Sequence, residues 1–375
     1  MMKTGILTLP LHTNYGGILQ AYALQTVLER MGHDAYVISL ADKPLRLPVW
    51  RMPVKYARRL LRNLKGHPYP IFYERKFNRE KPIVRQHTDK FIRRYIKPAV
   101  YEGYGSIREG DFDAIVVGSD QVWRPQYFDD IRTAYLDFTS GWKIRRMAYA
   151  ASFGTDRWEY GRLLTAQCAR LLKRFDYVSV REDSGVDLCR ERFGVEAEHV
   201  LDPTMLLHAD DYALLAGSCG MHDGKRGMMC YILDDTPWKA ALTASVAESL
   251  NLQPFRVNSR VEDINAPLAE RVQPPVEQWL RGFIDSRFVI TDSFHACVFS
   301  IIFNKPFIAV ANRGRGVSRF RSLLSMFGLE SRLLDEEASP DVQALVSGGI
   351  QWDEVNGRLS RYRDMSMDFL ARLGH

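Results

Sequence analysis

Residues 5–40 read GILTLPLHTNYGGILQAYALQTVLERMGHDAYVISL, and this stretch decides the fold class. It begins with a short apolar run, passes through a glycine-containing turn at 14–17 and continues with apolar residues at helical spacing. A glycine at position 32 ends the helical pattern, and a second apolar run follows at 35–40. A strand, a helix and a second strand in this order form a βαβ unit, which predicts a parallel sheet with helices on its faces.

The same alternation continues along the chain. We expect further strands at 112–117, 146–152, 177–180, 227–233, 254–257, 288–291 and 306–310, with helices between and after them. Because 375 residues exceed what one hydrophobic core usually serves, two domains are expected. We predict an α/β protein in which two Rossmann-like domains, residues 1–205 and 206–375, face each other across a cleft, with a terminal helix at 355–372.

The composition is that of a globular protein, with 46% hydrophobic and 26% charged residues. No apolar run reaches the length of a membrane-spanning helix, and the first residues lack the regions of a signal peptide, so we expect a cytoplasmic protein. The five cysteines are scattered without a CxxC pair, which predicts free thiols rather than disulfides or a zinc site. No spacing suggests any other metal site.

One segment is strongly basic. Residues 43–108 contain 18 Lys and Arg but four Asp and Glu, whereas the rest of the chain is net acidic. We interpret the segment as a helical insertion that covers one edge of the first domain, and its charge as a sign of an anionic partner such as a membrane surface. A solvated helical face is the alternative. Because no nucleic-acid-binding signature accompanies the charge, nucleic acid is not expected as a partner.

Several predicted strands end in polar, turn-rich sequences, where open α/β sheets place their ligands. Glycines at the first such turn let a backbone approach a ligand, and the helix that follows favours an anion. After the strand at 112–117, an Asp and a Gln could bind sugar hydroxyls or hold a catalytic group, and a Trp could stack on a sugar. Helix capping and core packing are the alternatives. The candidate residues are Asn14, Tyr15, Gly16, Gly17, Ser119, Asp120, Gln121 and Trp123.

Three later segments carry groups suited to an anionic ligand. Arg181 follows the strand at 177–180 and could grip a carboxylate or phosphate, or pair with a neighbouring acid on the surface. His295 lies in the first turn of a predicted helix, after Asp292 and Ser293, where it could transfer a proton beside a phosphate. A basic, glycine-rich loop that contains Arg315 and Arg319 could cradle a second anionic group.

Taken in order, these motifs resemble the polysaccharide pyruvyltransferase family. The resemblance spans about residues 5–335. The matching motifs are Asn14-Tyr15-Gly16-Gly17 with the helix start that follows it, Gly118-Ser119-Asp120-Gln121-Val122-Trp123, Ser179-Val180-Arg181-Glu182, Asp202-Pro203-Thr204, Thr291-Asp292-Ser293-Phe294-His295, and Arg315-Gly316 with Ser318-Arg319-Phe320.

The resemblance implies a GT-B-like fold, phosphoenolpyruvate as co-substrate with no other cofactor, and a sugar acceptor in a bacterial surface polysaccharide. In the characterised branch of the family, residues in the pattern of Arg181 and His295 serve donor binding and catalysis. That branch has an arginine two residues before the histidine, where this sequence has Ser293. If the chemistry is kept, the cation must come from elsewhere, and Arg315 and Arg319 are the candidates.

The implied reaction forms a pyruvate ketal and releases phosphate. We expect His295 to donate the proton, Asp120 to orient or deprotonate the acceptor, residues 1–205 to form the acceptor side and residues 206–375 the donor side. The acceptor could be linked to polyprenyl diphosphate, with the basic segment holding the protein at the inner face of the plasma membrane. Two alternatives stay open: a nucleotide-sugar glycosyltransferase on the same fold, and a sugar-binding relative without activity.

Overall fold

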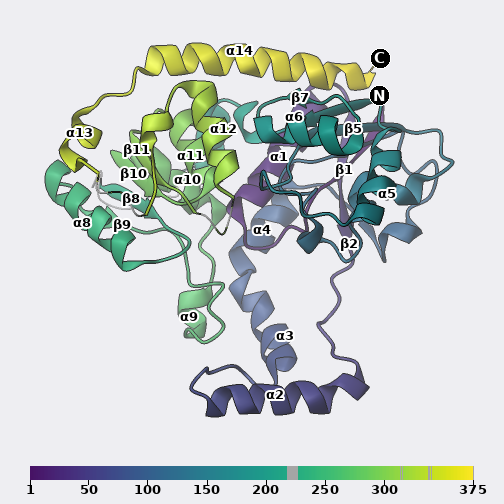
Figure 1. Ribbon diagram of the computed structural model, residues 1–375, viewed down its shortest axis with the longest axis horizontal. Coiled ribbons are helices and arrows are strands. Elements are labelled where there is room, and N and C mark those ends of the chain that lie inside the picture. Colours follow the sequence, from purple (N-terminus) through teal and green to yellow (C-terminus); the bar gives the residue numbers. More distant parts are fainter. Residues whose placement is uncertain (218–226, 313, 315, 337, 339, 375) are drawn as a thin grey trace.

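The computed structural model describes residues 1–217, 227–312, 314, 316–336, 338 and 340–374. They form two separate parallel sheets flanked by helices (Figure 1). The two sheets belong to the two halves of the chain, and their carboxyl ends meet at a common pocket. The prediction of two Rossmann-like α/β domains in a GT-B-like arrangement is therefore confirmed.

The N-terminal sheet has the strand order β3-β2-β1-β4-β5-β6-β7, and every pairing is parallel. The chain moves outward from β1 on one side and then outward from β4 on the other. The order therefore reverses between β1 and β4, which is where doubly wound sheets bind ligands. The strands are β1 (Lys3–Leu7), β2 (Asp34–Leu40), β3 (Pro98–Tyr101), β4 (Ala114–Val117), β5 (Arg145–Ala151), β6 (Tyr177–Val180) and β7 (Glu198–His199).

The C-terminal sheet has the order β12-β11-β10-β8-β9 and is also entirely parallel. Its order reverses between β8 and β10, so the loops that follow these two strands occupy the equivalent ligand-binding position. The strands are β8 (Met228–Tyr231), β9 (Pro254–Phe255), β10 (Phe288–Thr291), β11 (Phe307–Val310) and β12 (Leu333–Leu334).

The helices lie between and after the strands, as predicted. In the first of them, the Asn14 side chain accepts a hydrogen bond from the amide of Gly17 and caps the helix. The helices are α1 (Tyr15–Arg30), α2 (Met52–Leu64), α3 (Tyr73–Val84), α4 (Gln86–Tyr95), α5 (Arg162–Leu172), α6 (Asp183–Leu188), α7 (Ala209–Ala216), α8 (Pro237–Leu250), α9 (Leu268–Arg271), α10 (Val276–Asp285), α11 (Phe294–Ile302), α12 (Val317–Phe327), α13 (Val342–Ser347) and α14 (Trp352–Ala371).

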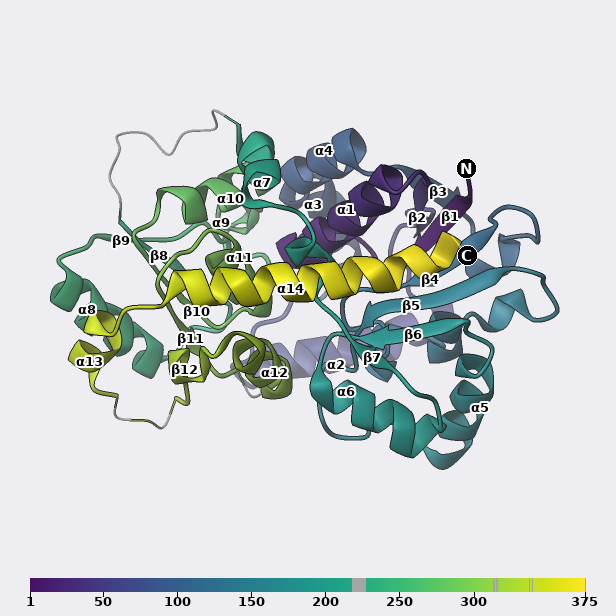
Figure 2. The same cartoon turned by 90° about the horizontal axis from the view of Figure 1, so that it is seen from above.

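The terminal helix α14 joins the two domains. Seen from above, it runs across the molecule from the C-terminal sheet to the N-terminal one (Figure 2). Near its end Phe369 packs against Tyr149 and Tyr177, and the Ser366 hydroxyl accepts a hydrogen bond from the Leu201 amide. The predicted limits assigned this helix to the second domain, but its last turns pack on the first, because their apolar side chains complete that core.

The basic insertion differs from its prediction. Instead of covering an edge, the chain after β2 leaves the body as an arm, residues 43–84, which contains α2 and α3 (Figure 1). The chain then returns through α4 and supplies the edge strand β3 itself, a strand that the sequence pattern did not predict. Within the insertion, α3 and α4 are separate helices, since Pro82 cannot donate a helical hydrogen bond and α3 ends two residues later.

Candidate active site

The ligand-binding ends of the two sheets face each other across a pocket of about 800 Å³. The N-terminal domain contributes residues 12–14 and 16, which lie between β1 and α1 or at the start of α1. The C-terminal domain contributes the loop after β8 (231–235), the segment 256–263 and, at the start of α11, Ser293 and His295. The pocket therefore lies where both strand orders reverse, as the parallel topology predicts.

His295 stands at the boundary between the domains, in the first turn of α11. Its Nε2 lies 3.5 Å from Oδ2 of Asp202. The other edge of the ring rests on α1, where a Cβ added to Gly16 would lie 2.0 Å from Nδ1. Position 16 therefore requires glycine, because any side chain there would displace the imidazole. The ring comes from the C-terminal domain and is held between a carboxylate and a helix start of the N-terminal domain.

Asp202 is the centre of the cluster. Its carboxylate accepts hydrogen bonds from Nη1 of Arg181 at 2.7 Å, the Ser119 hydroxyl at 3.2 Å, and the amide and hydroxyl of Thr204 at 3.0 and 2.6 Å. Burial alone would raise the pKa of Asp202, but the neighbouring His295 ring and the Arg181 guanidinium hold it well below its usual value. Asp202 is therefore a buried carboxylate that stays ionised.

Arg181 is enclosed, with 1% of its side chain exposed. Besides the bond to Asp202, its Nη2 lies 3.6 Å from Oδ1 of Asp120, and its guanidinium stacks on the Phe294 ring with 4.5 Å to the centroid. Burial opposes its charge, but Asp202 and Asp120 outweigh burial and raise its pKa. Within the described part of the chain, its Nε and Nη2 make no hydrogen bond, so two buried donor groups are left over.

Arg319, on α12, is the second buried guanidinium of the cluster. Its Cζ lies 5.5 Å from the centroid of the same Phe294 ring. Burial and the charge of Arg181 lower the pKa of Arg319 to about 10. Two guanidinium groups thus lie close together at the Phe294 ring. The ring attracts each cation, whereas the two positive charges repel each other.

The sequence model of the family described as polysaccharide pyruvyl transferase matches residues 14–314. The chain belongs to this family. The match includes Arg181, Asp202 and His295, whereas Arg319 lies just beyond its end. A comparison with curated protein sequences finds no match.

By their titles, solved structures with a similar course of the chain include two UDP-GlcNAc 2-epimerases and a glycotransferase. UDP-GlcNAc 2-epimerase from Methanocaldococcus jannaschii is 11% identical, with a TM-score of 0.44 over 96% of this chain and 92% of that one. UDP-GlcNAc 2-epimerase from Neisseria meningitidis, bound to UDP-GlcNAc, is 9% identical, with a TM-score of 0.48 over 98% and 94%. The glycotransferase of kitacinnamycin is 11% identical, with a TM-score of 0.45 over 99% of both chains.

Three of the predicted polar residues do not line the pocket of this pyruvyl transferase family member, and two of them, Ser119 and Asp120, contact the cluster instead. The Ser119 amide donates to Gln20, and its hydroxyl donates to Asp202, so Ser119 positions the carboxylate. Asp120, at a φ of 66°, lies behind Gly17, whose added Cβ would be 3.5 Å from Oδ2. Gln121 accepts from Arg124 and packs against Gly154. Their predicted contacts with substrate stay predictions, as does that of Gly17.

Three predicted ligand contacts need correction. Trp123 is fully buried and stacks on Tyr135 at 5.3 Å, so it packs in the core and cannot stack on a sugar. Tyr15 is also buried, and it stacks on Trp279 and donates to the Pro274 carbonyl, which ties α1 to the second domain. Asp292 turns away from His295 to pair with the buried Lys239, because this carboxylate also caps the Leu233 and Asp234 amides.

The remaining predicted residues have mixed positions. Asn14, Gly16 and Ser293 line the pocket with His295. Arg315 lies outside the described residues. Asp202 was quoted within a family motif but not selected as a site residue, although a polar residue directly after a strand pattern could have marked it. The structure brings it together with Arg181 and His295 from three separate segments.

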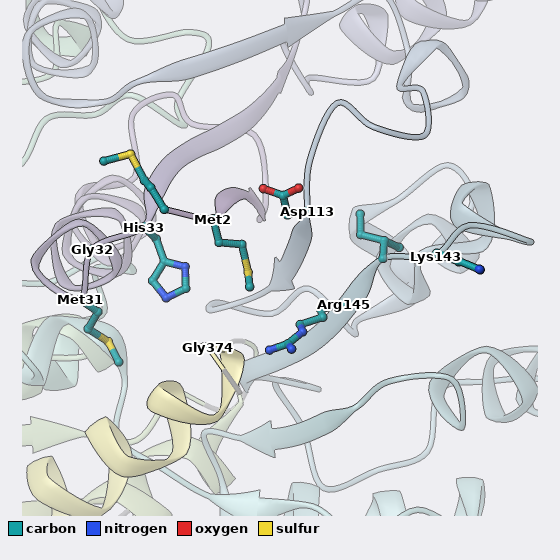
Figure 3. A pocket seen from close by; sticks show the side chains of 10 residues that line it. Met2, Met31, Gly32, His33, Asp113, Lys143, Arg145 and Gly374 are labelled. Carbon is teal, nitrogen blue, oxygen red and sulfur yellow. The ribbon is translucent and has the colours of Figure 1, made fainter.

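Figure 3 shows a second hollow, of about 810 Å³, which shares no lining residue with the interdomain pocket. Its lining includes His33, Asp113 and Arg145, near both chain ends. These residues precede or begin the strands β2, β4 and β5, so the hollow is at the amino ends of the sheet. Ligands of doubly wound sheets bind at the opposite, carboxyl ends. In the described part of the chain no group of three or more His, Cys, Asp or Glu could hold a metal ion.

Proposed function

We propose that the protein transfers the enolpyruvyl group of phosphoenolpyruvate to a sugar of a bacterial surface polysaccharide, or of its lipid-linked precursor, to form a pyruvate ketal. The observation that carries the proposal is the pair of His295 and Asp202 at the interdomain pocket of a chain in this family. A carboxylate beside an imidazole orients the ring and stabilises its charged form, as general acid catalysis requires.

The donor would bind at the His295 end of the pocket. Phosphoenolpyruvate carries a phosphate and a carboxylate, and both need positive partners. The side chain of Ser293 makes no capping hydrogen bond at the amino end of α11, and the helix dipole favours an anion there. Neither Arg181 nor Arg319 lines the pocket, but both cations lie on the ring of Phe294, which precedes His295, and Arg181 has two donor groups without a hydrogen bond among the described residues. In this proposal these groups take the place of the arginine that the characterised branch has where this chain has Ser293.

The acceptor would bind along the remainder of the pocket. Two arginines of this wall are already neutralised, since Arg256 pairs with Asp235 and Arg260 pairs with Asp263. Asn14, Asn258 and Ser259 add uncharged polar groups to the lining. A wall of paired charges and amides suits the many hydroxyls of a neutral sugar better than it suits a second anion.

The proposed steps conserve atoms and charge. His295 donates a proton to the methylene carbon of phosphoenolpyruvate, which leaves C2 as an oxocarbenium-like centre. One sugar hydroxyl adds to C2 and loses its proton. The bond from C2 to the phosphate oxygen then breaks, and phosphate leaves with the electron pair. A second hydroxyl of the same sugar adds to C2 and loses its proton, so one of the two hydroxyl protons restores His295 and the other leaves with phosphate. Asp120 would orient or deprotonate the acceptor.

Calorimetric titration with phosphoenolpyruvate tests the donor. We expect saturable binding by the wild type and by Ser293→Ala, and binding at least about tenfold weaker for Ser293→Asp, which puts a negative charge at the amino end of α11. His295→Ala should retain donor binding, because its proposed role is chemical. Arg181→Ala is a poorer test, since it would leave the buried Asp202 carboxylate without its cation.

The titration distinguishes a pyruvyl transferase from a nucleotide-sugar glycosyltransferase. Binding of phosphoenolpyruvate that responds to position 293 supports the pyruvyl transferase reaction. If the wild type binds a nucleotide sugar such as UDP-GlcNAc and not phosphoenolpyruvate, the donor assignment is wrong and the protein is a glycosyltransferase. Release of phosphate from phosphoenolpyruvate in the presence of candidate sugars, lost in His295→Ala, then tests the chemical step.

A further inference from the structure

The arm helix α2 presents an apolar face to solvent. None of its residues is buried, and the apolar side chains that it exposes include Trp50 just before it, at 72%, and Val54, Leu61 and Leu64, at 72%, 58% and 76%. At 100° per residue these four positions fall within one third of the helix circumference. Exposed apolar side chains that gather in one continuous stripe usually mark an interaction surface.

A basic stripe runs beside the apolar one. Arg51, Lys55, Arg58 and Arg62 are all exposed, and they lie on the next sector of the same helix. The whole segment 43–73 contains eight Lys and Arg and no Asp or Glu. The third sector faces inward, where Arg59 pairs with Glu74 and Asn63 bonds to the backbone of Tyr69. The helix is thereby held with its apolar and basic stripes outward.

We propose that α2 lies in the headgroup region of an anionic membrane and anchors the protein to its surface. A short helix that carries an apolar stripe beside a basic one is the form that binds in the plane of an interface. Acidic headgroups complement the exposed basic stripe of Arg51, Lys55, Arg58 and Arg62, beside which the segment 43–73 has no acidic residue. A second copy of the chain is a poor occupant, because a symmetric contact would place two basic stripes together. Among the described residues no helix is both long and apolar enough to cross the bilayer.

The arm is connected to the pocket. Lys76 of α3 donates to the Ile264 carbonyl, Asn265 donates to the Pro68 carbonyl, and the buried ion pair of Arg271 and Glu80 fixes α9 to α3. The chain just before these contacts, 256–263, forms the pocket wall. A membrane under α2 would thus lie on the arm side of the pocket, which is the place for a lipid-linked acceptor. This consequence rests on the proposed function, whereas membrane binding itself does not.

Vesicle sedimentation of the full-length protein tests the anchor. Vesicles of phosphatidylcholine alone are compared with vesicles that contain phosphatidylglycerol. We expect the wild type to bind the anionic vesicles and to be released by salt. Leu61→Asp should weaken binding at least about tenfold, and Arg58→Gln about fivefold, because each basic residue near the surface contributes about a factor of five. Both side chains are exposed, so neither change should unfold the protein.

Helix α5 of the N-terminal domain, outside the arm, offers matched controls. Leu163→Asp and Arg170→Gln change an exposed leucine and an exposed arginine there, and both should bind like the wild type. The proposal is overturned if the wild type does not bind anionic vesicles at low salt, or if the controls weaken binding as much as the α2 variants do. Light scattering gives a separate check: a dimer that Leu61→Asp dissociates would assign the stripe to a second copy instead. Phosphoenolpyruvate binding by Leu61→Asp stays at the wild-type level if the two sites are independent.

Discussion

The cluster around Asp202 and the arm helix α2 hold the same kind of side chain in opposite surroundings. Arg181 is 1% exposed and balanced by two buried carboxylates, whereas Arg58 is exposed with no acidic residue between 43 and 73. In the first region each charge depends on its neighbours, because water cannot solvate it. In the second, water solvates Arg58 and the other charges of the outward basic stripe separately. Substitutions should therefore affect folding at the cluster and surface binding at the arm.

The largest expected effect comes from removing the carboxylate at the centre of the cluster. Asp202→Asn should lower the free energy of unfolding by about 3–5 kcal/mol, since it leaves the buried Arg181 charge without its main partner. Arg58→Gln, at the arm, should change it by no more than about 0.5 kcal/mol. Urea unfolding at pH 7 measures both. If both variants lower the free energy of unfolding by a similar amount, charges at the cluster and at the arm do not differ in their effect on folding.

Acid should affect the cluster through the same carboxylate. The pKa of Asp202 in the folded protein is lowered from its usual 3.8, so the unfolded state binds a proton more readily. The stability that Asp202 contributes is therefore complete above about pH 4 and is lost as the pH falls below that value. The difference in unfolding free energy between the wild type and Asp202→Asn should be constant from pH 7 to 5 and shrink below pH 4. A difference that shrinks already near pH 6 would assign the effect to another group.

Replacing glycine by alanine should have opposite effects on stability at positions 16 and 357. Gly16→Ala should destabilise the protein by about 1–3 kcal/mol, because the new Cβ would lie 2.0 Å from Nδ1 of His295. The displaced imidazole should also abolish phosphate release. Gly357→Ala is the matched control, since it also lies within a helix, α14, but has no atom within 4 Å of the added Cβ. It should stabilise by about 0.5–1 kcal/mol. Thermal unfolding of both variants shows whether the signs are opposite.

The sequence predicted the cluster's loops better than its contacts. Apolar strands that end in polar turns placed the motifs of Arg181 and His295 at the carboxyl ends of β6 and β10, and the parallel topology brought them together. Asp202 was not selected, because its partners Arg181 and His295 are distant in sequence and no local pattern joins them. Which side chain of a loop points to the ligand depends on packing across the domain boundary.

Trp123 and Tyr15 are the opposite case, since the sequence placed them at the ligand site and the structure places them in the core. Both follow polar turns at the switch point and were expected to contact substrate, yet each fills a hydrophobic space. The charge count of residues 43–108 marked the basic region, but it could not show that α2 stands away from the body. Periodicity predicts that a helix has an apolar stripe. It does not tell whether the protein covers that stripe or leaves it exposed.

The smallest expected effect distinguishes two adjacent arginines of α2. Arg59 forms two hydrogen bonds with Glu74, at 2.8 and 2.6 Å, and a third with the Ile71 carbonyl, so it holds the helix on the arm. Arg59→Gln should therefore make the α2 amides exchange with solvent about tenfold faster, a local opening of about 1.4 kcal/mol. The midpoint of global unfolding should stay the same, because the arm can open without the two sheets.

Arg58→Gln serves as the control, since the exposed Arg58 points away from these contacts, and it should leave exchange unchanged while weakening vesicle binding. Exchange in α2 that responds equally to both variants would mean that the basic stripe itself holds the helix. The arm would then be fixed by the same mutual dependence of charges as the cluster. If only Arg59→Gln changes the exchange, the two adjacent arginines have different roles. Arg59 then orients the helix, and Arg58 is free to contact a membrane.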